Sequence, residues 1–562
     1  MEWKPKFLGE EDKVKILQEN VGVPFEIANL LVQRGIYDFD SAKKFFRPEL
    51  SDLHDPFLML GMEATVERIS TAIGSQEKIM VYGDYDVDGT TSVALVFSYL
   101  TSYYSNCIYY IPDRYKEGYG ISKKGIDHAK KEAISLIIAL DCGINALDNV
   151  AYAKELGIDF IICDHHLPGT DLPDAFAILN PKQKNCNYPF KELCGCGIGF
   201  KLIQALSQER DLSLETLLPY LDLVAMAIAA DVVPIHHENR TLTYYGLAQI
   251  QEYPREGIKL FIAGLKRKLN VSDLVFVIAP RINGAGRIKH GSNAVELLLS
   301  TEPNDAISKG RVIELLNSER KALDHNITGQ ALDQIVDNQE QNNYSTVVFQ
   351  PDWHKGVIGI VASRLIETYY RPTAVFTASG GFLTGSVRSV KGVDVYQILD
   401  SCKDYIEKFG GHRYAAGLTI KAEDYIPFKK AFEQAVAAII KPEQRVPCIN
   451  YDMEISFDKI TPKFYRIMNQ MAPFGPGNLR PVFMTKNCMD AGKSRAIGED
   501  KTHLKLYTID DSGLILSAIG FGMAEHISRI KSRDSFKLLY TVEENEFKGE
   551  ISLQLKLKDL RF

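Results

Sequence analysis

Three short apolar runs, each followed at once by metal-ligating side chains, constrain the fold of this chain more than any other feature. The runs cover residues 78–82, 136–140 and 160–163, and they are rich in Ile and Val. Runs of this length and composition are typical of buried strands in a parallel sheet. Ligands of such sheets bind just beyond the carboxyl ends of the strands. The sequence therefore predicts a sheet edge that carries carboxylates and imidazoles, and the segment 163–166, Cys-Asp-His-His, is its most informative part.

The acidic residues at this edge favour a bound cation. Asp84, Asp86, Asp88 and Asp141 would bring up to four negative charges together, and unpaired carboxylates repel one another and raise one another's pKa. No lysine or arginine lies within residues 82–91. Carboxylates with imidazoles suit manganese, magnesium or zinc, and manganese tolerates mixed ligands best. A calcium loop fits less well, because this chain has leucine where an EF-hand loop needs its twelfth-position Glu; a solvated acidic turn is the other alternative.

The spacing of these aspartates also predicts local structure. Alternate residues of an extended segment share a side, so Asp84, Asp86 and Asp88 would point the same way. Gly89 can then turn the chain into a helix that starts near residues 90–92, where hydroxyl caps are expected.

A further carboxylate, Asp231, lies inside the most apolar stretch of the chain, residues 221–234. A buried carboxylate is costly unless it is paired or metal-bound. Taken alone, Asp231 is better interpreted as a helix cap or as a turn partner before Pro234. Beside the other acidic segments, metal ligation becomes the better interpretation.

These residues form a series that resembles a known family. Residues 82–89, 141–143, 164–166 and 230–234 are similar to the successive motifs of the DHH phosphoesterase superfamily, and among its branches to the RecJ family. Further similar segments follow in order from about residue 20 to the end of the chain: 111–120, 279–287, 353–362, 385–389, 409–412 and 415–417. Two positions depart from the pattern. Tyr82 stands where several other branches have His, which leaves one metal site with fewer imidazoles, and Gly284 stands where Ala is commoner.

The resemblance implies a 5′→3′ exonuclease that hydrolyses single-stranded DNA to mononucleotides with two divalent ions, Mn²⁺ or Mg²⁺, in DNA repair and recombination. In that pattern Asp141 bridges the two ions and Asp86 binds one of them. The other ion is bound by Asp88, His165 and Asp231. Asp84 supports the first site directly or through water.

The resemblance also assigns the residues that touch the substrate. The predicted catalytic residues are Asp84, Asp141 and His166, of which His166 would contact the scissile phosphate or, alternatively, orient a ligand through a hydrogen bond. Positions that would grip the 5′-terminal phosphate or approach the substrate are Arg114, Arg287, Ser386, Arg388 and His412, with Arg281 as an alternative to Arg287. Arginine suits this task because its planar fork bonds phosphate oxygens in pairs. An arginine by itself is more often a surface ion-pair partner, and His412 beside two glycines can equally be a packed residue of a tight turn.

The organisation of the chain fits an α/β protein of several parts. We expect a helical lead-in over residues 1–45, a doubly wound parallel-sheet DHH domain over 46–300, and a connecting helix over 301–340. A second α/β, DHH-associated domain would cover 341–440, and an OB-like β-barrel that binds single strands would cover 445–562. Gly310 and Gly329 weaken the prediction that the connecting helix is unbroken. Phe474, Phe521 and Tyr540 can stack bases in the barrel or belong to its core.

Composition limits the other functions. The chain has 562 residues, 65 basic and 72 acidic, and its net charge of −7 argues against a protein that coats nucleic acid without selectivity. No run of eighteen apolar residues and no signal peptide are present, so a cytoplasmic location without a membrane span is expected. Nine scattered cysteines indicate reduced thiols, and Cys194-x-Cys196 lacks the spacing of a structural zinc site.

The family resemblance also suggests partners and leaves two rival functions. It implies a 5′-ended single strand as substrate, a single-strand-binding protein and a RecQ-type helicase as partners, and a monomer. One rival is a DHH phosphoesterase for short oligonucleotides or cyclic dinucleotides, which would not need the β-barrel. The other is an inactive single-strand-binding scaffold, which would have lost the acidic ligands that this chain retains.

Overall fold

The three apolar runs form adjacent strands of one parallel sheet in the computed structural model, which describes residues 1–265, 267–532 and 534–562. They are β2 (Lys78–Gly83), β4 (Ile134–Leu140) and β5 (Asp159–Cys163). The sheet has the order β3-β2-β4-β5-β6, with β3 (Cys107–Tyr110) and β6 (Ala177–Leu179) at its edges. The strand order reverses between β2 and β4, which is where open parallel sheets bind ligands.

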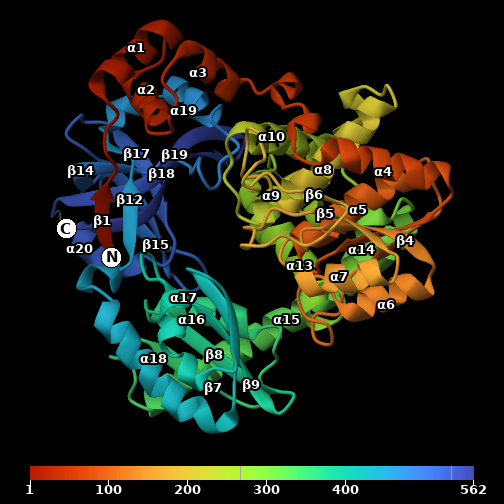
Figure 1. The fold of residues 1–562 in the computed structure, drawn as a ribbon. Helices are drawn as coiled ribbons and strands as arrows, with labels where there is room; N and C mark the ends of the chain where they lie inside the picture. The colour runs from red at the N-terminus through yellow and green to blue at the C-terminus, as the bar shows by residue number, and fades with distance from the viewer. Residues whose placement is uncertain (266, 533) are drawn as a thin grey trace.

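Helices cover both faces of this sheet, so the predicted doubly wound α/β fold is confirmed (Figure 1). One face packs against α6 (Lys123–Lys131) and α7 (Leu147–Glu155), through a core that includes Ile126 and Val150. The other face carries the larger core, formed with α4 (Met62–Gly74), α5 (Val87–Thr101), α8 (Gly195–Glu209), α9 (Leu221–Ala230) and α10 (His237–Glu252). Each strand contributes side chains to both cores, because successive residues of a strand point to opposite faces of the sheet.

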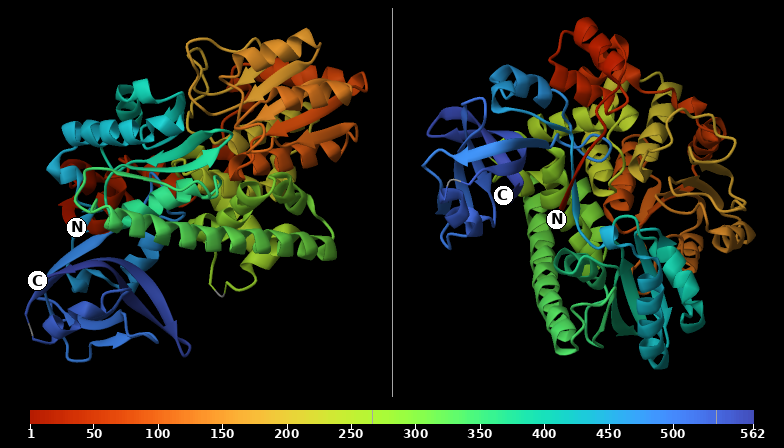
Figure 2. Two further views of the ribbon diagram at one scale, coloured as in Figure 1. Left: turned by 90° about the horizontal axis from the view of Figure 1, so that it is seen from below. Right: turned by 90° about the vertical axis from the view of Figure 1, so that its left-hand side faces the viewer.

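A group of shorter helices leads from this domain into the connecting helix. They are α11 (Glu256–Ile262), α12 (Val271–Asp273), a π-helical turn (Leu274–Ile278), α13 (Ala279–Ile288) and α14 (Ser292–Leu299). The connecting helix α15 (Pro303–Asp337) has 35 residues and runs straight through both glycines (Figure 2). The two glycines therefore do not interrupt the predicted helix: Gly310 lies against Leu260, where a Cβ would come within 2.8 Å, and Pro303 suits the first turn.

The second α/β unit contains a five-stranded sheet of order β10-β11-β9-β8-β7. Only β7 (Thr346–Phe349) and β8 (Thr373–Ser379) pair in parallel; β9 (Phe382–Arg388), β11 (Ala415–Ile420) and β10 (Lys408–His412) continue the sheet in antiparallel fashion. Its helices are α16 (Ile358–Thr368), α17 (Val395–Ser401) and α18 (Tyr425–Ile439).

The C-terminal part is built as an OB-like ring of strands. The pairings run β14-β18-β19-β17-β16, and β16 pairs back with β14, so five strands form a closed circuit. Their bounds are β14 (Phe483–Asp490), β16 (His503–Ile509), β17 (Ile515–Gly520), β18 (Phe536–Phe547) and β19 (Glu550–Arg561). Short elements complete this part: β12 (Cys448–Tyr451), β13 (Met453–Glu454), α19 (Pro462–Asn469), β15 (Arg495–Ile497) and α20 (Ile527–Lys531).

The N-terminal segment is more than a helical lead-in. It contains β1 (Glu2–Pro5), which pairs in parallel with β12, followed by α1 (Glu11–Val21), α2 (Phe25–Val32) and α3 (Phe39–Phe46). Its apolar residues share one core with the C-terminal part of the chain, for example Leu30 of α2 with Phe464 and Met468 of α19. Amphipathic helices that cannot bury their apolar face alone need such a partner, and here it comes from the opposite end of the chain.

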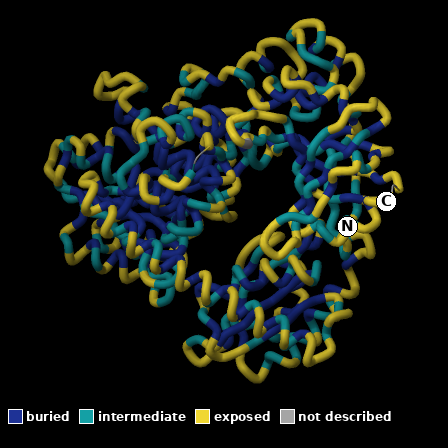
Figure 3. Tube along the Cα trace, turned by 180° about the vertical axis from the view of Figure 1, so that it is seen from behind, coloured by how far each residue is buried: buried dark blue, intermediate teal, exposed yellow. Residues whose placement is uncertain are grey.

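The parts are arranged in a ring, which Figures 1 and 3 show from opposite sides. Arg240 of α10 closes the ring: its guanidinium, only 3% exposed as a residue, donates to the carbonyls of Phe45, Met471, Ala472 and Pro473. The amide of Ile235 also donates to the carbonyl of Pro476 at 2.6 Å. No helix within the described residues is long and apolar enough to cross a membrane.

Candidate metal centre and substrate site

The carboxyl ends of β2, β4 and β5 bring the predicted ligands into one cluster around His165. The Nε2 atom of His165 lies 3.3 Å from Asp141 Oδ1, 3.6 Å from Asp231 Oδ2 and 3.7 Å from Asp88 Oδ2. Asp141 adopts a left-handed backbone conformation (φ 60°) directly after β4, and Asp231 stands at the C-terminal end of α9. The strand ends and one helix end therefore supply the site, as expected for this class of sheet.

Two triplets of side chains in this cluster can each hold a metal ion. Asp88, His165 and Asp231 form one, Asp141, His165 and His166 form the other, and the donor atoms within each triplet lie within 4.8 Å of one another. The first triplet is the set that the sequence predicted for one ion. The second joins the predicted bridging carboxylate to both imidazoles.

The start of helix α5 differs from its expected place, and Asp86 caps it. The helix α5 begins at Val87 rather than near residue 90, and the Asp86 side chain is its cap, accepting from the amide of Gly89 at 3.1 Å. The hydroxyls that were expected to cap it bond instead to carbonyls one turn back, as Thr90 Oγ1 does to the Asp86 carbonyl at 2.6 Å. Carboxylates are preferred caps because they accept from unpaired helix amides, so Asp86 takes this role before Thr90 can.

The electrostatics of the cluster show how costly these carboxylates are without a cation. Burial, and then repulsion from Asp88 and Asp86, raises the pKa of Asp231 to about 8. Burial and Asp86 raise the pKa of Asp88 to about 6, and burial with neighbouring carboxylates raises those of Asp84 and Asp141 well above the ordinary range. Burial lowers the pKa of His165 to about 3, so its imidazole is neutral and suited to ligation.

Unsatisfied polar atoms support the same interpretation. Asp84 Oδ2 and both ring nitrogens of His165 are buried without a hydrogen-bond partner among the described residues. Arg114 and Lys182, from outside residues 82–91, reduce the repulsion felt by Asp84 and Asp231 respectively. Over the described ranges, however, no lysine or arginine lies within 4.0 Å of a carboxylate of the cluster. Buried donors and acceptors without partners, in a set of oxygen and imidazole ligands, fit a divalent cation.

Two supporting contacts were not predicted from the sequence. The amides of Gly195 and Cys196, at the start of α8, donate to Asp88 at 2.6 and 2.7 Å. Gly195 also has to be glycine, because a Cβ there would lie 2.6 Å from that of Asp141. The Cys194-x-Cys196 segment thus serves as a helix start that holds a ligand; all nine cysteines are free thiols, and eight of them are buried.

Asp164 fixes the orientation of His166. Its carboxylate accepts from the His166 ring Nδ1 at 2.7 Å and from the amides of His166 and Ile144 at 3.1 and 2.9 Å. Burial opposes ionisation of Asp164, but the hydrogen bonds to its carboxylate outweigh burial and lower the pKa of Asp164. Burial also opposes protonation of His166, but the hydrogen bond to Asp164 outweighs it and raises the pKa of the imidazole. The other ring nitrogen, Nε2, lies 3.2 Å from the hydroxyl of Tyr119.

Three of the predicted substrate-binding arginines form a second cluster beside the first. Arg287 is partly buried and donates to the Gly356 carbonyl at 3.0 Å. Burial, Arg114 and Arg388 together lower its pKa to about 9. Arg388 donates to Ser386 Oγ at 3.1 Å, and both lie against Gly359 in the first turn of α16, where a Cβ would come within 3.0 Å of each. Arg114, Arg287 and Arg388 form no ion pair with any described carboxylate, so together with a helix N-terminus they present an anion site.

Two other candidates are not brought to this cluster. Arg281 pairs with Glu314 at 2.6 Å and donates to the carbonyl of Val277, so it stabilises the contact between α13 and α15. His412 is exposed at the end of β10, and no contact joins it to the arginines in the described part of the chain. Arg287 therefore lies with Arg114 and Arg388, whereas its alternative Arg281 does not.

The three aromatic residues that could stack bases in the OB-like part differ in how exposed they are. Tyr540 is fully buried and bonds Thr485 at 2.6 Å, so it belongs to the core. Phe474 is partly buried under Arg480, whereas Phe521 is 55% exposed beside His503.

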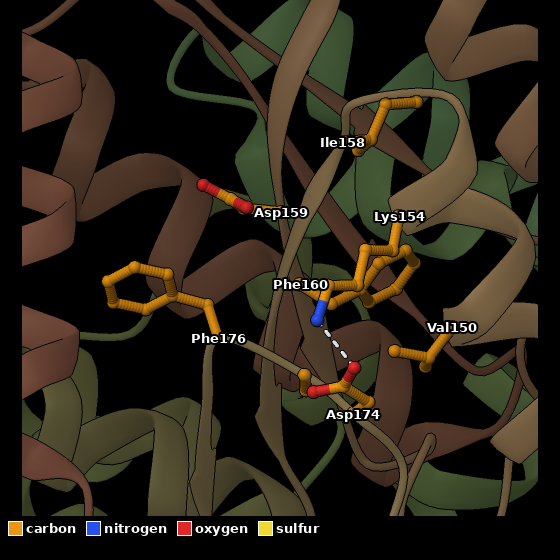
Figure 4. A pocket seen from close by; sticks show the side chains of 8 residues that line it. Val150, Lys154, Ile158, Asp159, Phe160, Asp174 and Phe176 are labelled. Carbon is orange, nitrogen blue, oxygen red and sulfur yellow. Dashed lines mark hydrogen bonds and ion pairs between the residues drawn. The ribbon is translucent and has the colours of Figure 1, made fainter.

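The hollow shown in Figure 4, with Lys154 paired to Asp174, lies at the amino end of β5 and hence at the opposite end of the sheet from the metal cluster.

Comparison with known proteins identifies the family. Models of the DHH family N-terminal domain, the DHHA1 domain and the RecJ OB domain match residues 78–228, 341–438 and 451–559. The chain is 38% identical to the single-stranded-DNA-specific exonuclease RecJ of Bacillus subtilis (strain 168), over 98% of this chain and 70% of that protein. The chain belongs to the RecJ family.

Other RecJ proteins match this chain along most of their length. The RecJ of Escherichia coli (strain K12), also named a single-stranded-DNA-specific exonuclease, is 32% identical over 97% of this chain and 98% of its own. The crystal structure of Thermus thermophilus RecJ in complex with Mn²⁺ superposes with a TM-score of 0.85 at 25% identity, covering 100% of this chain and 79% of that one. A further RecJ structure bound to manganese is 31% identical, with a TM-score of 0.60, over 71% of this chain and 99% of that one.

Proposed function

We propose that this protein is a single-stranded-DNA-specific exonuclease that releases mononucleotides from the 5′ end. The observation that carries the proposal is the pair of adjacent clusters: acidic and imidazole ligands around His165, and three arginines without carboxylate partners beside them. Relatives of this chain are named as exonucleases of that specificity. An exonuclease needs both a hydrolytic centre and a device that senses the chain end, and the two clusters supply one each.

The hydrolytic centre would take two Mn²⁺ or Mg²⁺ ions in the cluster around Asp141 and His165. The residues present fit such ions, since Asp84 Oδ2 and both ring nitrogens of His165 are buried without hydrogen-bond partners among the described residues. The Nε2 atom of His165 also lies within 3.7 Å of three carboxylates. Two RecJ relatives were crystallised with manganese. When bound, paired ions activate a water molecule and neutralise the charge that develops on the phosphate.

The protein groups then have distinct tasks. Asp141 contacts both ligand sets, because it lies 3.3 Å from His165 and belongs to the triplet with His166, and this supports its assignment as the bridging ligand. Asp88, His165 and Asp231 hold one ion. Asp86 caps α5 through one carboxylate oxygen, which leaves the other oxygen for the second ion.

His166 would face the scissile phosphate, held in place by Asp164. Water attacks phosphorus and the bond to the 3′ oxygen of the terminal nucleotide breaks, so a mononucleotide leaves. The remaining strand again begins with a 5′-phosphate. Each catalytic cycle therefore regenerates a 5′-phosphate that the arginine cluster can bind.

The arginine cluster would bind that 5′-phosphate. Arg114, Arg287 and Arg388 offer planar donors, Ser386 adds a hydroxyl, and the start of α16 adds backbone amides. Arg281 is the less favoured candidate because Glu314 already neutralises it. His412 stands as a candidate contact to the strand, since its exposed position at the end of β10 leaves the ring accessible.

The wider setting rests on membership of the family. We infer a cytoplasmic enzyme of DNA repair and recombination that acts as a monomer, with a single-strand-binding protein and a RecQ-type helicase supplying 5′ tails. The OB-like part would bind the portion of the strand that lies farther from the two clusters, with the exposed ring of Phe521 as a stacking surface. The functional units would be residues 46–300, 341–440 and 445–562, joined by the helix in 301–340, with residues 1–45 packed on the last.

The proposal is tested with end-labelled strands and free Mn²⁺. A single strand with a 5′-phosphate, the same strand with a 5′-hydroxyl, and a strand blocked at its 3′ end are compared over time. We expect mononucleotides from the 5′ end of the first and third strands, and slower release from the hydroxyl end. Cleavage restricted to fragments of a few nucleotides would instead favour a small-substrate phosphoesterase and contradict the proposal.

A further inference from the structure

Two lysines that the proposed function does not use lie beside the arginine cluster. Lys355 and Lys408 are both exposed, and over the described part of the chain no carboxylate lies within 4.0 Å of either ammonium group. The carboxylate next to Lys408 in sequence, Glu407, pairs with Lys421 at 3.2 Å instead. Burial, and then repulsion from Lys408 and Arg114, lowers the pKa of Lys355, so these cations lie near one another. Like charges gathered without counterions favour a bound anion.

The backbone on both sides of Lys355 is clamped against the arginine cluster. The ring of His354 packs edge-to-face on that of Tyr115, with 5.9 Å between the centroids, and Tyr115 follows an arginine of the cluster in the chain. The carbonyl of Gly356 accepts from Arg287 at 3.0 Å, and a Cβ at Gly356 would come within 2.4 Å of the Arg287 carbonyl. Lys355 stands between these two anchors, so its exposed side chain leaves the backbone at the border of the arginine cluster.

Lys408 projects from the same face of the second sheet as Ser386 and Arg388. Lys408 of β10 is opposite Thr419 of β11, which is opposite Thr384 of β9. Residues opposite one another in neighbouring strands share a face of the sheet, and so do alternate residues of one strand. Thr384, Ser386 and Arg388 are alternate residues of β9, so the side chain of Lys408 shares their face.

The surface between Lys408 and Ser386 is open because glycines form it. Gly410 of β10 is opposite Gly417 of β11, which is opposite Ser386. A Cβ at Gly410 would meet nothing within 4 Å, and one at Gly417 would meet only the Gly385 carbonyl, at 3.9 Å. Backbone without side chains lets a ligand approach closely, so an anion has room between the lysine and the arginine cluster.

The contacts place Arg114 between the metal cluster and Lys355. The guanidinium of Arg114 lies 4.6 Å from the centroid of the Tyr85 ring, and Tyr85 follows Asp84 in the chain. The next residue, Tyr115, packs instead on the residue before Lys355. A strand that runs from the arginine cluster to the metal cluster therefore leaves the two lysines beyond its 5′-terminal phosphate.

We propose that Lys355 and Lys408 bind the outer phosphates of a strand with a 5′-diphosphate or 5′-triphosphate, so that the enzyme accepts these ends besides the monophosphate. The proposal rests on the 5′-exonuclease function given above. A terminal monophosphate carries about two negative charges at neutral pH, and the three arginines already neutralise it. Each further phosphate adds negative charge that the lysines can balance.

The reaction at the metal cluster stays the same with such an end. Water attacks the phosphorus of the first internucleotide phosphate, and the bond to the 3′ oxygen of the terminal nucleotide breaks. The 3′ oxygen takes a proton, and the remaining strand keeps the phosphate. The first product is then a nucleoside 5′-triphosphate with its phosphate chain intact, and every later product is a monophosphate.

The test compares three 5′ ends on one single-stranded DNA sequence: triphosphate, monophosphate and hydroxyl. Wild type, Lys355→Gln, Lys408→Gln and the double variant are assayed in the same excess of Mn²⁺. Steady-state KM and kcat are measured for each end, and ion-exchange chromatography identifies the first product. Lys430→Gln is the matched control, because Lys430 is exposed on α18, which packs on the face of the second sheet opposite to α16.

We expect wild type to have a KM about tenfold lower for the triphosphorylated strand than for the monophosphorylated one, and to release a nucleoside triphosphate first. Each lysine variant should raise the KM for the triphosphorylated strand about fivefold, and the KM for the monophosphorylated strand by less than about twofold. High salt should reduce the difference between the two ends, because exposed charges are screened. Lysine variants that raise both KM values equally would overturn the proposal, because the lysines would then contact the strand itself.

Wild type alone separates a failure of this proposal from a failure of the proposed function. A wild type that releases nothing from the 5′ end of the monophosphorylated strand would reject the exonuclease function. A wild type that degrades this strand but binds the triphosphorylated one no better, or releases no nucleoside triphosphate from it, would reject the role of the lysines alone. The three ends give this result even if a lysine variant does not fold.

Discussion

Replacing Asp231 by asparagine should stabilise the metal-free protein and weaken the metal-bound one. The pKa of Asp231 is raised from its ordinary 3.8 to about 8, first by burial and then by Asp88 and Asp86. Between these two values the folded protein keeps a proton that the unfolded chain has released. Its stability without metal therefore falls as pH rises from about 4 to about 8. Asparagine does not ionise, so the stability of the variant does not fall in this way as pH rises.

The size of the effect follows from the same numbers. A pKa raised to about 8 sets a ceiling of about 6 kcal/mol at pH above 8, at about 1.4 kcal/mol for each tenfold change in proton affinity. The Asp231 side chain keeps 29% of its exposure and shares its repulsion with Asp88, whose own proton relieves part of it. We therefore expect the variant to gain about 2 kcal/mol at pH 8.5 in the presence of a chelator.

Metal should reverse the order. Mn²⁺ at one hundred times its dissociation constant would stabilise wild type by about 2.7 kcal/mol, whereas the variant lacks one ligand and gains less. Thermal unfolding in chelator and in Mn²⁺, at pH 5 and pH 8.5, measures both effects. Asp171→Asn is the control, because Asp171 is exposed in the loop after β5. A variant less stable than wild type in chelator at pH 8.5, or one stabilised equally by Mn²⁺, would refute the reasoning.

Three further predictions concern the arginines and the catalytic imidazole. Arg388→Ala should raise KM for a 5′-phosphorylated strand about 10- to 100-fold by removing charge-assisted hydrogen bonds, whereas Arg281→Ala should leave KM unchanged, and equal losses would contradict the assignment. Arg240→Ala should destabilise the ring closure by about 3 kcal/mol or more, because buried carbonyls lose their donor; calorimetry and limited proteolysis would show it, and an unchanged melting curve would count against it. Asp164→Asn should lower kcat about 100-fold or more with little change in KM, because His166 loses the partner that orients it; stopped-flow and steady-state kinetics separate the two, and a pure KM effect would argue for a different role.

The strands and the acidic segments could be predicted because they depend on local sequence. Strand ends of a parallel sheet meet at one edge whatever the rest of the chain does, so Asp141 and His165 were placed correctly relative to each other. The choice between Arg287 and Arg281 needed the structure, since both lie on α13 and only packing shows that Glu314 neutralises Arg281. Helical periodicity does not reveal a partner that comes from another helix.

Other features depended on contacts between distant segments. The amides of Gly195 and Cys196 that hold Asp88 come from a helix start more than one hundred residues away. The N-terminal helices bury their apolar faces in a core shared with the C-terminal part of the chain, so their composition indicated helices without indicating the partner. The start of α5 was predicted too late for a local reason: the Asp86 carboxylate caps the helix, which therefore begins before the hydroxyls that follow it.

The most direct test of the account follows the release of the 5′-terminal nucleotide from a labelled single strand in Mn²⁺, with wild type and Asp141→Ala in parallel. A blunt duplex of the same sequence serves as the second substrate. The account predicts steady release of mononucleotides from the single strand by wild type, none from the duplex, and none from either with Asp141→Ala, while that variant keeps the wild-type circular dichroism spectrum. Undiminished cleavage by Asp141→Ala, or release from the duplex at the same rate, would contradict it.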